Sequence, residues 1–292
     1  MTGRNREKVR IAVIGGSGFY RMDGIRGLRE VRLRTPFGTP SDSVWIGTLD
    51  GFRCAFLPRH GRGHTILPTE VNSRANIYAL KSLGVEQIVA FGAVGSLKEE
   101  LAPRHFVFPD QVADKTKHRI STFFGEGIVG HVAFADPFCP DLQQILFETA
   151  VQAGLPSHRG GTYVCIEGPA FSTRAESEDH RRSGHSVVGM TALPESKLAR
   201  EAEICYVIAA MVTDYDVWKK GEEVSGERVL ENLGANVEDA KRLFRAALPK
   251  IAGLKRSCPC PEALHRAIFT QPRFVNRKAA GKLSLLIKKY LP

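Results

Sequence analysis

ICYVIAAMVTDYD, residues 204–216, is the segment that most narrows the architecture of this chain. Residues 204–212 are the longest apolar run of the whole chain, and this run is about half of the ~20 residues that a membrane-spanning helix needs. A short run of this kind predicts a buried β-strand, and Thr213-Asp214-Tyr215-Asp216 ends it. Because ligands of open α/β sheets bind beyond the carboxyl ends of strands, the two acids mark a candidate site.

Short apolar or alternating segments recur along the chain. We expect strands at residues 11–14, 44–49, 52–57, 87–91, 106–108, 162–166, 186–190 and 204–213. Helical patterns lie between them, at residues 69–84, 141–154, 173–184, 195–202 and 227–251, and Thr69 and Asp141 are the expected N-caps of the first two. Strands that alternate with helices predict an α/β fold with a mostly parallel sheet.

Length and composition indicate one large globular body. The chain has 292 residues, a formal net charge of +10, 43% hydrophobic residues and 25% charged residues, which excludes wholesale disorder and collagen-like sequence. We expect a single domain over residues 1–254. Residues 255–292 are a basic extension, with helical patterns at residues 262–269 and 278–291, that packs on the body or on a neighbouring subunit.

The positive charge raises the question of a polyanionic partner. Much of the excess lies in residues 4–10 and in the C-terminal extension, and no basic segment is interleaved with aromatic residues that would stack on bases. Nucleic acid is therefore not the expected ligand, and a polyanion-binding protein is kept as the non-enzymatic alternative. The N-terminal apolar stretch is too short for a signal peptide and no run is long enough to span a membrane, so the expected location is the cytoplasm.

Two segments that follow predicted strands have the composition of anion sites. Gly15-Gly16-Ser17-Gly18 lets backbone N–H groups and a hydroxyl approach a phosphate, but it lacks the dinucleotide-binding and P-loop spacings, and a tight turn explains it equally well. PRHGRGHT, residues 58–65, places four cationic or titratable side chains among glycines. Arginine and histidine hold phosphate through charge-assisted hydrogen bonds, whereas a metal site would need a further cysteine or carboxylate nearby.

Asp214 and Asp216 offer acid chemistry. When two carboxyl groups lie close together, one pKa rises, and that group keeps a proton to donate to a leaving group. A helix-capping aspartate beside a surface acid is the structural alternative.

The six cysteines differ in their surroundings. Four of them, at positions 54, 139, 165 and 205, lie in apolar sequence and are expected to be reduced core residues in a cytosolic protein. Cys258 and Cys260 flank a proline, and three states stay open for them: a local disulfide, a metal site together with His265, or free thiols. Because two cysteines supply only half of a tetrahedral zinc site, no metal is expected.

Taken in order, these segments resemble the purine nucleoside phosphorylase superfamily and, within it, the 5′-methylthioadenosine phosphorylases. The resemblance runs from residue 11 to about residue 251 and is carried by IAVIGGSGFY, FLPRHGRGHTILPTEVNSRANIYALKSLG, AVGSL, ADPFCPDL, IEGPAFSTRAES, GMTALPESKLAREAEICY and TDYDVW. It implies a three-layer α/β/α fold around a mixed β-sheet and a homotrimer. It also implies a pentosyltransferase that phosphorolyses a purine nucleoside to the free base and ribose 1-phosphate.

The resemblance assigns roles to particular residues. It implies a phosphate site made of Ser17, Arg59, His60, the backbone of Gly92 and Ala93, and the hydroxyl of Thr191. It implies a nucleoside site made of Phe171, Met190, Val229, Leu230 and, from a neighbouring subunit, His131 with Pro137-Phe138. Glu167 and Ser172 would support the wall of the base pocket, whereas Phe171 and Met190 taken alone would be core residues.

The same resemblance gives the chemistry. Asp214 and Asp216 would contact the purine, and one of them would protonate N7 as the glycosidic bond breaks. Bound phosphate would stabilise the cationic sugar and attack C1′, without a covalent enzyme intermediate. Inorganic phosphate is the co-substrate, and neither a metal nor an organic cofactor is implied.

The expected nucleoside is 5′-methylthioadenosine, in purine and methionine salvage. A carboxylate accepts a hydrogen bond from the 6-amino group of adenine, whereas the 6-carbonyl of hypoxanthine or guanine opposes it. The segment with Val224 and Gly226 resembles a helix that holds the methylthio group, and it contains no histidine for a 5′-hydroxyl. Gly226 replaces a bulkier residue, and Gly92 stands where relatives often carry Thr or Ser. The enzymatic alternatives are phosphorylases that prefer adenosine or inosine and guanosine, and a nucleosidase that uses water.

Overall fold

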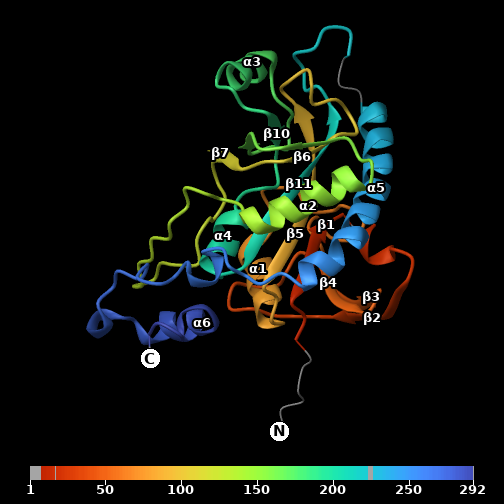
Figure 1. The fold of residues 1–292 in the computed structure, drawn as a ribbon. Helices are drawn as coiled ribbons and strands as arrows, with labels where there is room; N and C mark the ends of the chain where they lie inside the picture. The colour runs from red at the N-terminus through yellow and green to blue at the C-terminus, as the bar shows by residue number, and fades with distance from the viewer. Residues whose placement is uncertain (1–7, 17, 223–225, 292) are drawn as a thin grey trace.

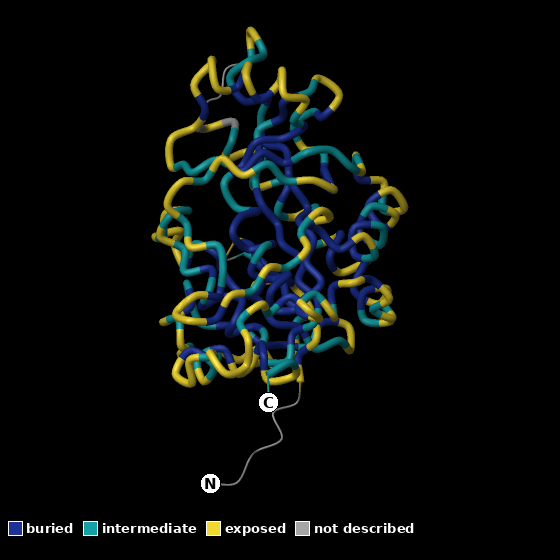
Figure 2. Tube along the Cα trace, turned by 90° about the vertical axis from the view of Figure 1, so that its left-hand side faces the viewer, coloured by how far each residue is buried: buried dark blue, intermediate teal, exposed yellow. Residues whose placement is uncertain are grey.

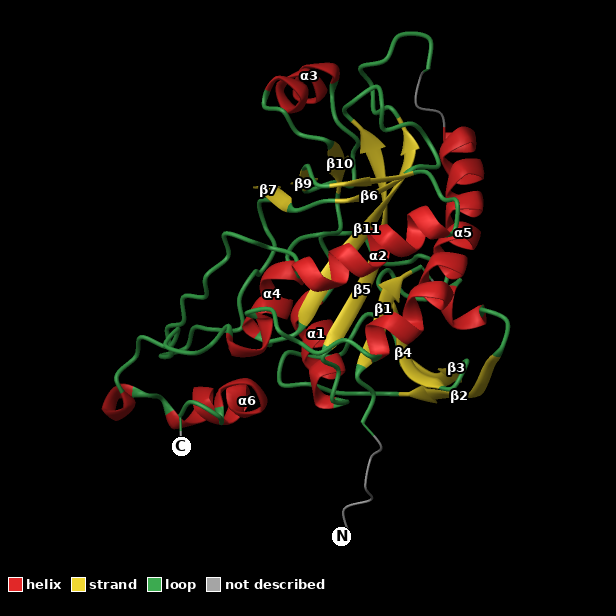
Figure 3. Cartoon of the chain, viewed as in Figure 1, coloured by secondary structure: helices red, strands yellow, loops and turns green. Residues whose placement is uncertain are grey.

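The centre of the molecule is a mixed β-sheet (Figures 1 and 3). The computed structural model describes residues 8–16, 18–222 and 226–291, and within them the sheet has 11 strands. The strands are β1 (Ile11–Gly15), β2 (Ile25–Val31), β3 (Val44–Leu49), β4 (Phe52–Pro58), β5 (Gln87–Ser96), β6 (Phe106–Phe108), β7 (Gln111–Lys115), β8 (Ser157–Arg159), β9 (Thr162–Ile166), β10 (Val187–Gly189) and β11 (Cys205–Asp214).

Strand β5 is the axis of the sheet. Its first residues pair in parallel with β1, its end pairs antiparallel with β10, and its other edge pairs in parallel with β11. On the far side of β1 lies the parallel strand β4, and β3 and β2 continue the sheet in antiparallel pairing. β9 and β7 continue it in parallel beyond β10, while β6 joins β11 antiparallel and pairs in parallel with β8. The parallel centre follows from the alternation of strands and helices, and the antiparallel strands around it make the sheet mixed.

Helices cover both faces of the sheet (Figure 1). Within the described ranges they are α1 (Ser73–Ser82), α2 (Pro140–Gln152), α3 (Arg174–Arg182), α4 (Glu195–Glu201), α5 (Gly226–Ala252) and α6 (Arg277–Ile287), with short 3-10 helices η1 (Phe19–Arg21), η2 (Cys260–Glu262) and η3 (Pro272–Phe274). Because side chains alternate along a strand, Ala12 and Ile14 of β1 are buried with α1 and α4, whereas Ile11 and Val13 are buried with α2 and α5. Figure 2 shows the buried centre enclosed by exposed loops and helices. The expected three-layer α/β/α fold is confirmed.

Some elements differ from the sequence-based expectation. Asn72, not Thr69, caps α1, because its side chain accepts a hydrogen bond from the Ala75 N–H. Asp141 lies in the first turn of α2, which begins at Pro140, and not at the N-cap. The sequence patterns miss β2, β7 and β8, because these strands are short or expose most of their residues and carry no apolar run.

Residues 255–291 pack on both helical layers of the body. Cys258 and Cys260 are buried with α2 and α5, whereas the apolar side of α6 is buried with α1 and α4. The helix expected at residues 262–269 is wrong: beyond η2 the chain turns, and residues 267–269 bond to residues 129–131 of another loop. In the described part of the chain, no helix combines the length and the apolar character needed to cross a membrane.

Candidate active site

A cavity of about 400 Å³ opens where the central parallel strands end. The carboxyl ends of β1, β4, β5 and β11 meet at this edge, which is where α/β sheets bind ligands. The lining includes these residues expected from the sequence: Arg59, His60, Gly92, Ala93, Phe171, Ser172, Met190, Thr191, Asp214, Asp216 and Val229. Ser17 and Val224 lie outside the described residues.

One backbone edge of β5 is open to the cavity. β1 pairs with β5 as far as Ala90 and β10 pairs with it from Gly95 onward, so among the described residues no strand covers residues 91–94 on this edge. The Phe91 carbonyl faces this edge, because it accepts a hydrogen bond from Arg59 at 2.8 Å. Peptide groups alternate between the two edges of a strand, so the Ala93 N–H faces the cavity as well and can donate to an anion.

Arg59, directly after β4, is held by a buried acid. Its guanidinium donates to Glu195 through Nε at 2.5 Å and through Nη2 at 2.9 Å, and Tyr206 donates its hydroxyl to the same carboxylate at 3.0 Å. Arg59 is only 3% exposed and Glu195 only 1%. A guanidinium has five N–H groups, so after these bonds and the one to Phe91 two remain for a phosphate.

His60 is a neutral group in this site. Burial, assisted by the charge of Arg59, lowers the pKa of His60 to about 4. Nδ1 lies 2.9 Å from the Ile66 carbonyl, which can only accept, so Nδ1 carries the proton and Nε2 is free. The sequence interpretation has His60 donate to phosphate, whereas the neutral ring has only Nε2 left and can there accept, but not donate, a hydrogen bond.

Asp214 and Asp216 lie together at the end of β11. Asp214 accepts hydrogen bonds from the Thr213 hydroxyl at 2.7 Å and from the Asp216 N–H at 2.8 Å. Asp216 is 4% exposed, and its Oδ2 has no hydrogen-bond partner in the described structure. Burial raises the pKa of both carboxyl groups, and the charge of Asp214 raises that of Asp216 further. The pair therefore has the geometry of a proton donor and not of a surface acid beside a helix cap.

The other expected nucleoside residues separate into two groups. Phe171 lines the cavity and is 65% exposed, so it is not a core residue, and the buried Ser172 hydroxyl beside it has no partner among the described residues. Val229 of α5 lines the cavity, whereas Leu230 points to solvent at 69% exposure and is not part of the lining. The helical turn explains this difference, because successive residues of α5 face different directions.

The loops around the cavity are fixed by Arg119, a residue that the sequence does not mark. Arg119, on the loop after β7, donates to the carbonyls of Glu167 at 2.6 Å, Met190 at 2.5 Å and Leu193 at 2.6 Å. Glu167 lies outside the cavity lining; its carboxylate accepts from the Lys117 N–H and pairs with Arg119. Arg119 is one of several basic residues in a polar segment, and nothing in the sequence distinguishes it.

His131 and Phe138 have different surroundings. His131 is exposed and packs edge-on against Phe269, with ring centroids 5.2 Å apart, and it does not line the cavity of its own chain. Phe138 is 3% exposed and belongs to the hydrophobic core of its own chain. Of these two residues, only His131 is accessible to a neighbour.

Gly92 makes room for Thr191, which gives the first prediction. A Cβ atom at Gly92 would lie 2.5 Å from the Thr191 hydroxyl, so this hydroxyl occupies the space that a side chain at position 92 would take. We expect Gly92→Ala to displace the hydroxyl and to raise KM for phosphate about tenfold or more, the usual value of one hydrogen bond to a charged group. Initial rates against phosphate concentration measure the effect. Gly281→Ala, in an open position on α6, is the control, and an unchanged phosphate KM in Gly92→Ala contradicts the role of Thr191.

Comparison with known proteins gives the family of the chain. Residues 10–249 match the family described as the phosphorylase superfamily. The S-methyl-5′-thioadenosine phosphorylase of Geobacter sulfurreducens is 52% identical over 283 residues, covering 96% of this chain and 99% of that protein. The enzyme of the same name from Chloroflexus aurantiacus is 53% identical over 282 residues, covering 96% and 98%.

Solved structures agree with the sequence relatives. A crystal structure of methylthioadenosine phosphorylase from an Antarctic soil metagenomic library superposes with a TM-score of 0.92 at 46% identity and covers 96% of this chain and 99% of its own. Methylthioadenosine phosphorylase from Schistosoma mansoni in complex with adenine superposes with a TM-score of 0.81 at 35% identity, covering 96% and 98%. With this fold, this cavity and these relatives, the chain belongs to the phosphorylase superfamily.

Proposed function

We propose that the protein phosphorolyses 5′-methylthioadenosine to adenine and 5-methylthioribose 1-phosphate. The observation that carries this proposal is one cavity that joins an anion site to a pair of acids, of which Asp216 is buried and Asp214 half-buried. Arg59, the Ala93 N–H and Thr191 line one part of it, and Asp214 and Asp216 line another. The matching enzymes named above support the same activity.

The residues divide the reaction between two ends of the substrate. Phosphate, held by Arg59 and the open edge of β5, stabilises the positive charge that develops at C1′ and attacks it. A carboxyl group with a raised pKa gives its proton to N7, so that adenine leaves as a neutral base. An ionised partner carboxylate accepts from the 6-amino group, which favours 6-aminopurines over hypoxanthine and guanine.

The 5′ end of the nucleoside fits an apolar wall. Val229, Leu233 and Val237 of α5 line the cavity, and their spacing of four residues puts them on one helical face. None of these three side chains can hydrogen-bond a 5′-hydroxyl, whereas a methylthio group is buried favourably against them. This wall is the structural reason to prefer 5′-methylthioadenosine over adenosine.

The proposed assembly is a cytoplasmic homotrimer that uses inorganic phosphate as co-substrate and no cofactor in catalysis. The exposed Phe171 at the cavity and the exposed His131 on a separate loop fit a site closed by a neighbouring subunit. Light scattering of the purified protein should give the mass of three chains.

The activity is tested with methylthioadenosine, adenosine and inosine, each with and without phosphate, and with chromatography of the released base. We expect adenine, mainly from methylthioadenosine and only with phosphate. Preference for adenosine or inosine moves the enzyme to another substrate class, and release without phosphate indicates a nucleosidase. Absence of any base release, together with salt-dependent RNA binding, would favour the polyanion-binding alternative.

A further inference from the structure

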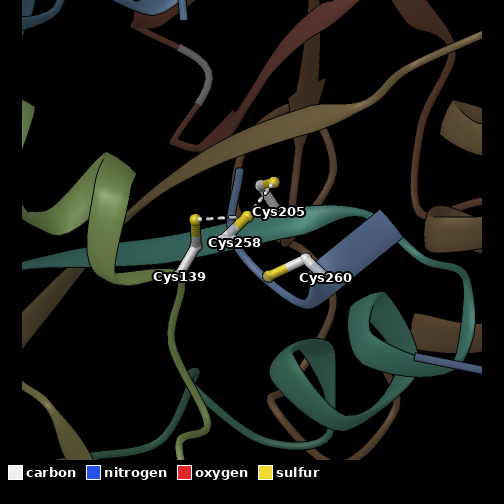
Figure 4. A group of neighbouring side chains, drawn as sticks. All are labelled: Cys139, Cys205, Cys258 and Cys260. Atoms are coloured by element: carbon white, nitrogen blue, oxygen red, sulfur yellow. Dashed lines mark hydrogen bonds between the residues drawn. The ribbon is translucent and has the colours of Figure 1, made fainter. Parts of the chain in front are cut away.

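Four cysteines from three separate segments meet inside the protein (Figure 4). Cys139 is the N-cap of α2, Cys205 is the first residue of β11, and Cys258 and Cys260 flank Pro259 in the C-terminal extension. All four are buried, and no two of their Sγ atoms lie more than 4.8 Å apart. The Sγ atom of Cys258 lies 3.6 Å from that of Cys139 and 3.4 Å from that of Cys205.

We propose that Cys139, Cys205, Cys258 and Cys260 bind one zinc ion as four thiolate ligands. A zinc–sulfur distance of about 2.3 Å places the ligands of a tetrahedral site about 3.8 Å apart. The measured separations of 3.4 Å and 3.6 Å lie just below this value and the upper limit of 4.8 Å lies above it, so small side-chain rotations bring the sulfurs into place. Four thiolates and no water are the ligand set of a closed, structural zinc site.

The sequence alone did not indicate this site, because it offered only half of the ligands. The local sequence offers only Cys258 and Cys260 with His265, whereas among the described residues the cluster of possible ligands contains four cysteines and not His265. The other two ligands are separated from the Cys-Pro-Cys segment by more than 50 residues of chain, and only the fold brings them together.

Positive groups surround the sulfurs. Four thiolates on a divalent ion leave a net charge of −2, which needs compensation inside a protein. The Arg256 guanidinium donates through Nε to Cys205 Sγ at 3.4 Å and is fixed by its bond to the Glu203 carbonyl at 2.6 Å. Cys139 stands at the N-terminus of α2, where unpaired backbone N–H groups favour negative charge. The acidic neighbour is Asp141, whose buried Oδ2 has no partner in the described structure.

The position of the site indicates a structural role. Cys205 and Asp214 are the two ends of β11, which at about 3.3 Å per residue places the sulfurs roughly 30 Å from the acids. The ion therefore takes no part in the reaction. It would fasten the start of the C-terminal extension to α2 and β11, and this inference does not depend on the proposed function.

The test is metal analysis of the full-length protein, expressed with zinc in the medium and purified under reducing conditions without chelator. Elemental mass spectrometry should find one zinc ion per chain in the unmodified protein and no bound zinc in Cys258→Ser. Cys54→Ala, which changes a buried cysteine outside the cluster, is the matched control and should keep the zinc. Cobalt exchanged for zinc should give the visible and near-ultraviolet bands of tetrahedral thiolate coordination in the control and not in Cys258→Ser.

Two results would overturn the proposal. One is protein without zinc whose four cluster thiols all react with a thiol reagent after unfolding. The other is protein without zinc whose intact mass shows the loss of hydrogens that disulfide formation requires. If Cys258→Ser does not fold, the unmodified protein is titrated with a chelator instead. The amount of zinc released should match the loss of the site that exchanges cobalt, and Tm should fall with it. If the chelator releases no zinc, the result counts against the site.

Discussion

Asp214→Asn is expected to lower kcat/KM by about 10²- to 10⁴-fold, the usual contribution of a positioned general acid. Asparagine keeps the shape of the side chain, and its one oxygen can still accept from the Asp216 N–H, while its NH2 group faces the Thr213 hydroxyl. It has no acidic proton to transfer. Comparison with the variant Asp216→Asn shows which of the two acids protonates the base. The variant that lacks the proton donor should lose more in kcat than the other. Steady-state kinetics measure both effects, and Asp110→Asn on the surface is the control.

The pH dependence has a definite sign. Burial raises the pKa of Asp214 and Asp216, so their protons are lost at a higher pH than those of an exposed aspartate. As the pH rises through these raised values, the unmodified enzyme loses its proton donor and kcat/KM falls. In the variant that lacks the acid, this fall at high pH should disappear.

Stability separates a catalytic role from a structural one. A carboxyl group with a higher pKa in the folded than in the unfolded protein lowers the free energy of unfolding as the pH rises from the unfolded pKa through the folded pKa. Asparagine cannot ionise, so Asp214→Asn should be at least as stable as the unmodified protein above that range in urea unfolding. Full activity in the double variant Asp214→Asn with Asp216→Asn, or a loss of activity fully explained by unfolding, contradicts the assignment.

The sequence predicts best the parts of the molecule that depend on local pattern. Apolar runs identify β3 and β6 with the bounds that the structure has. A charged residue at the end of an apolar run marks Arg59, which follows β4, and Asp214, the last residue of β11, as site residues. In α3, Thr173 and Glu176 form the capping box that begins the helix near the expected residue. These features need only a few neighbouring residues, so one sequence is enough to find them.

The rest depends on contacts between distant segments. The open edge of β5 exists because β1 pairs with β5 only as far as Ala90 and β10 pairs with it only from Gly95. No local pattern in the sequence of β5 shows where its neighbours stop pairing. The cysteine cluster needs α2, β11 and the C-terminal extension to meet. The segment 262–269 has a helical pattern, but its hydrogen bonds to residues 129–131 replace the helix, since tertiary pairing outweighs a weak local propensity.

Glu195→Gln is expected to lower the free energy of unfolding by about 3 kcal/mol, because it leaves the buried charge of Arg59 without its partner. The same change should raise KM for phosphate, since the two bonds from Glu195 aim the guanidinium at the cavity. Urea unfolding and phosphate kinetics measure the two effects. Asp50→Asn breaks an Arg245 pair of similar length that is more than 40% exposed, and it should lower the free energy of unfolding far less, because water screens an exposed pair.

A second variant distinguishes the binding role of this pair from its structural role. Arg59→Met combined with Glu195→Gln removes both buried charges and keeps an acceptor for the Tyr206 hydroxyl. Replacing a buried ion pair by uncharged side chains of similar size is often neutral for stability, so the double variant should recover most of the stability that Glu195→Gln loses. Its affinity for phosphate should stay low, because the guanidinium that binds the anion is gone. Recovery of phosphate affinity together with stability would mean that Arg59 only holds the fold and that another group binds the phosphate.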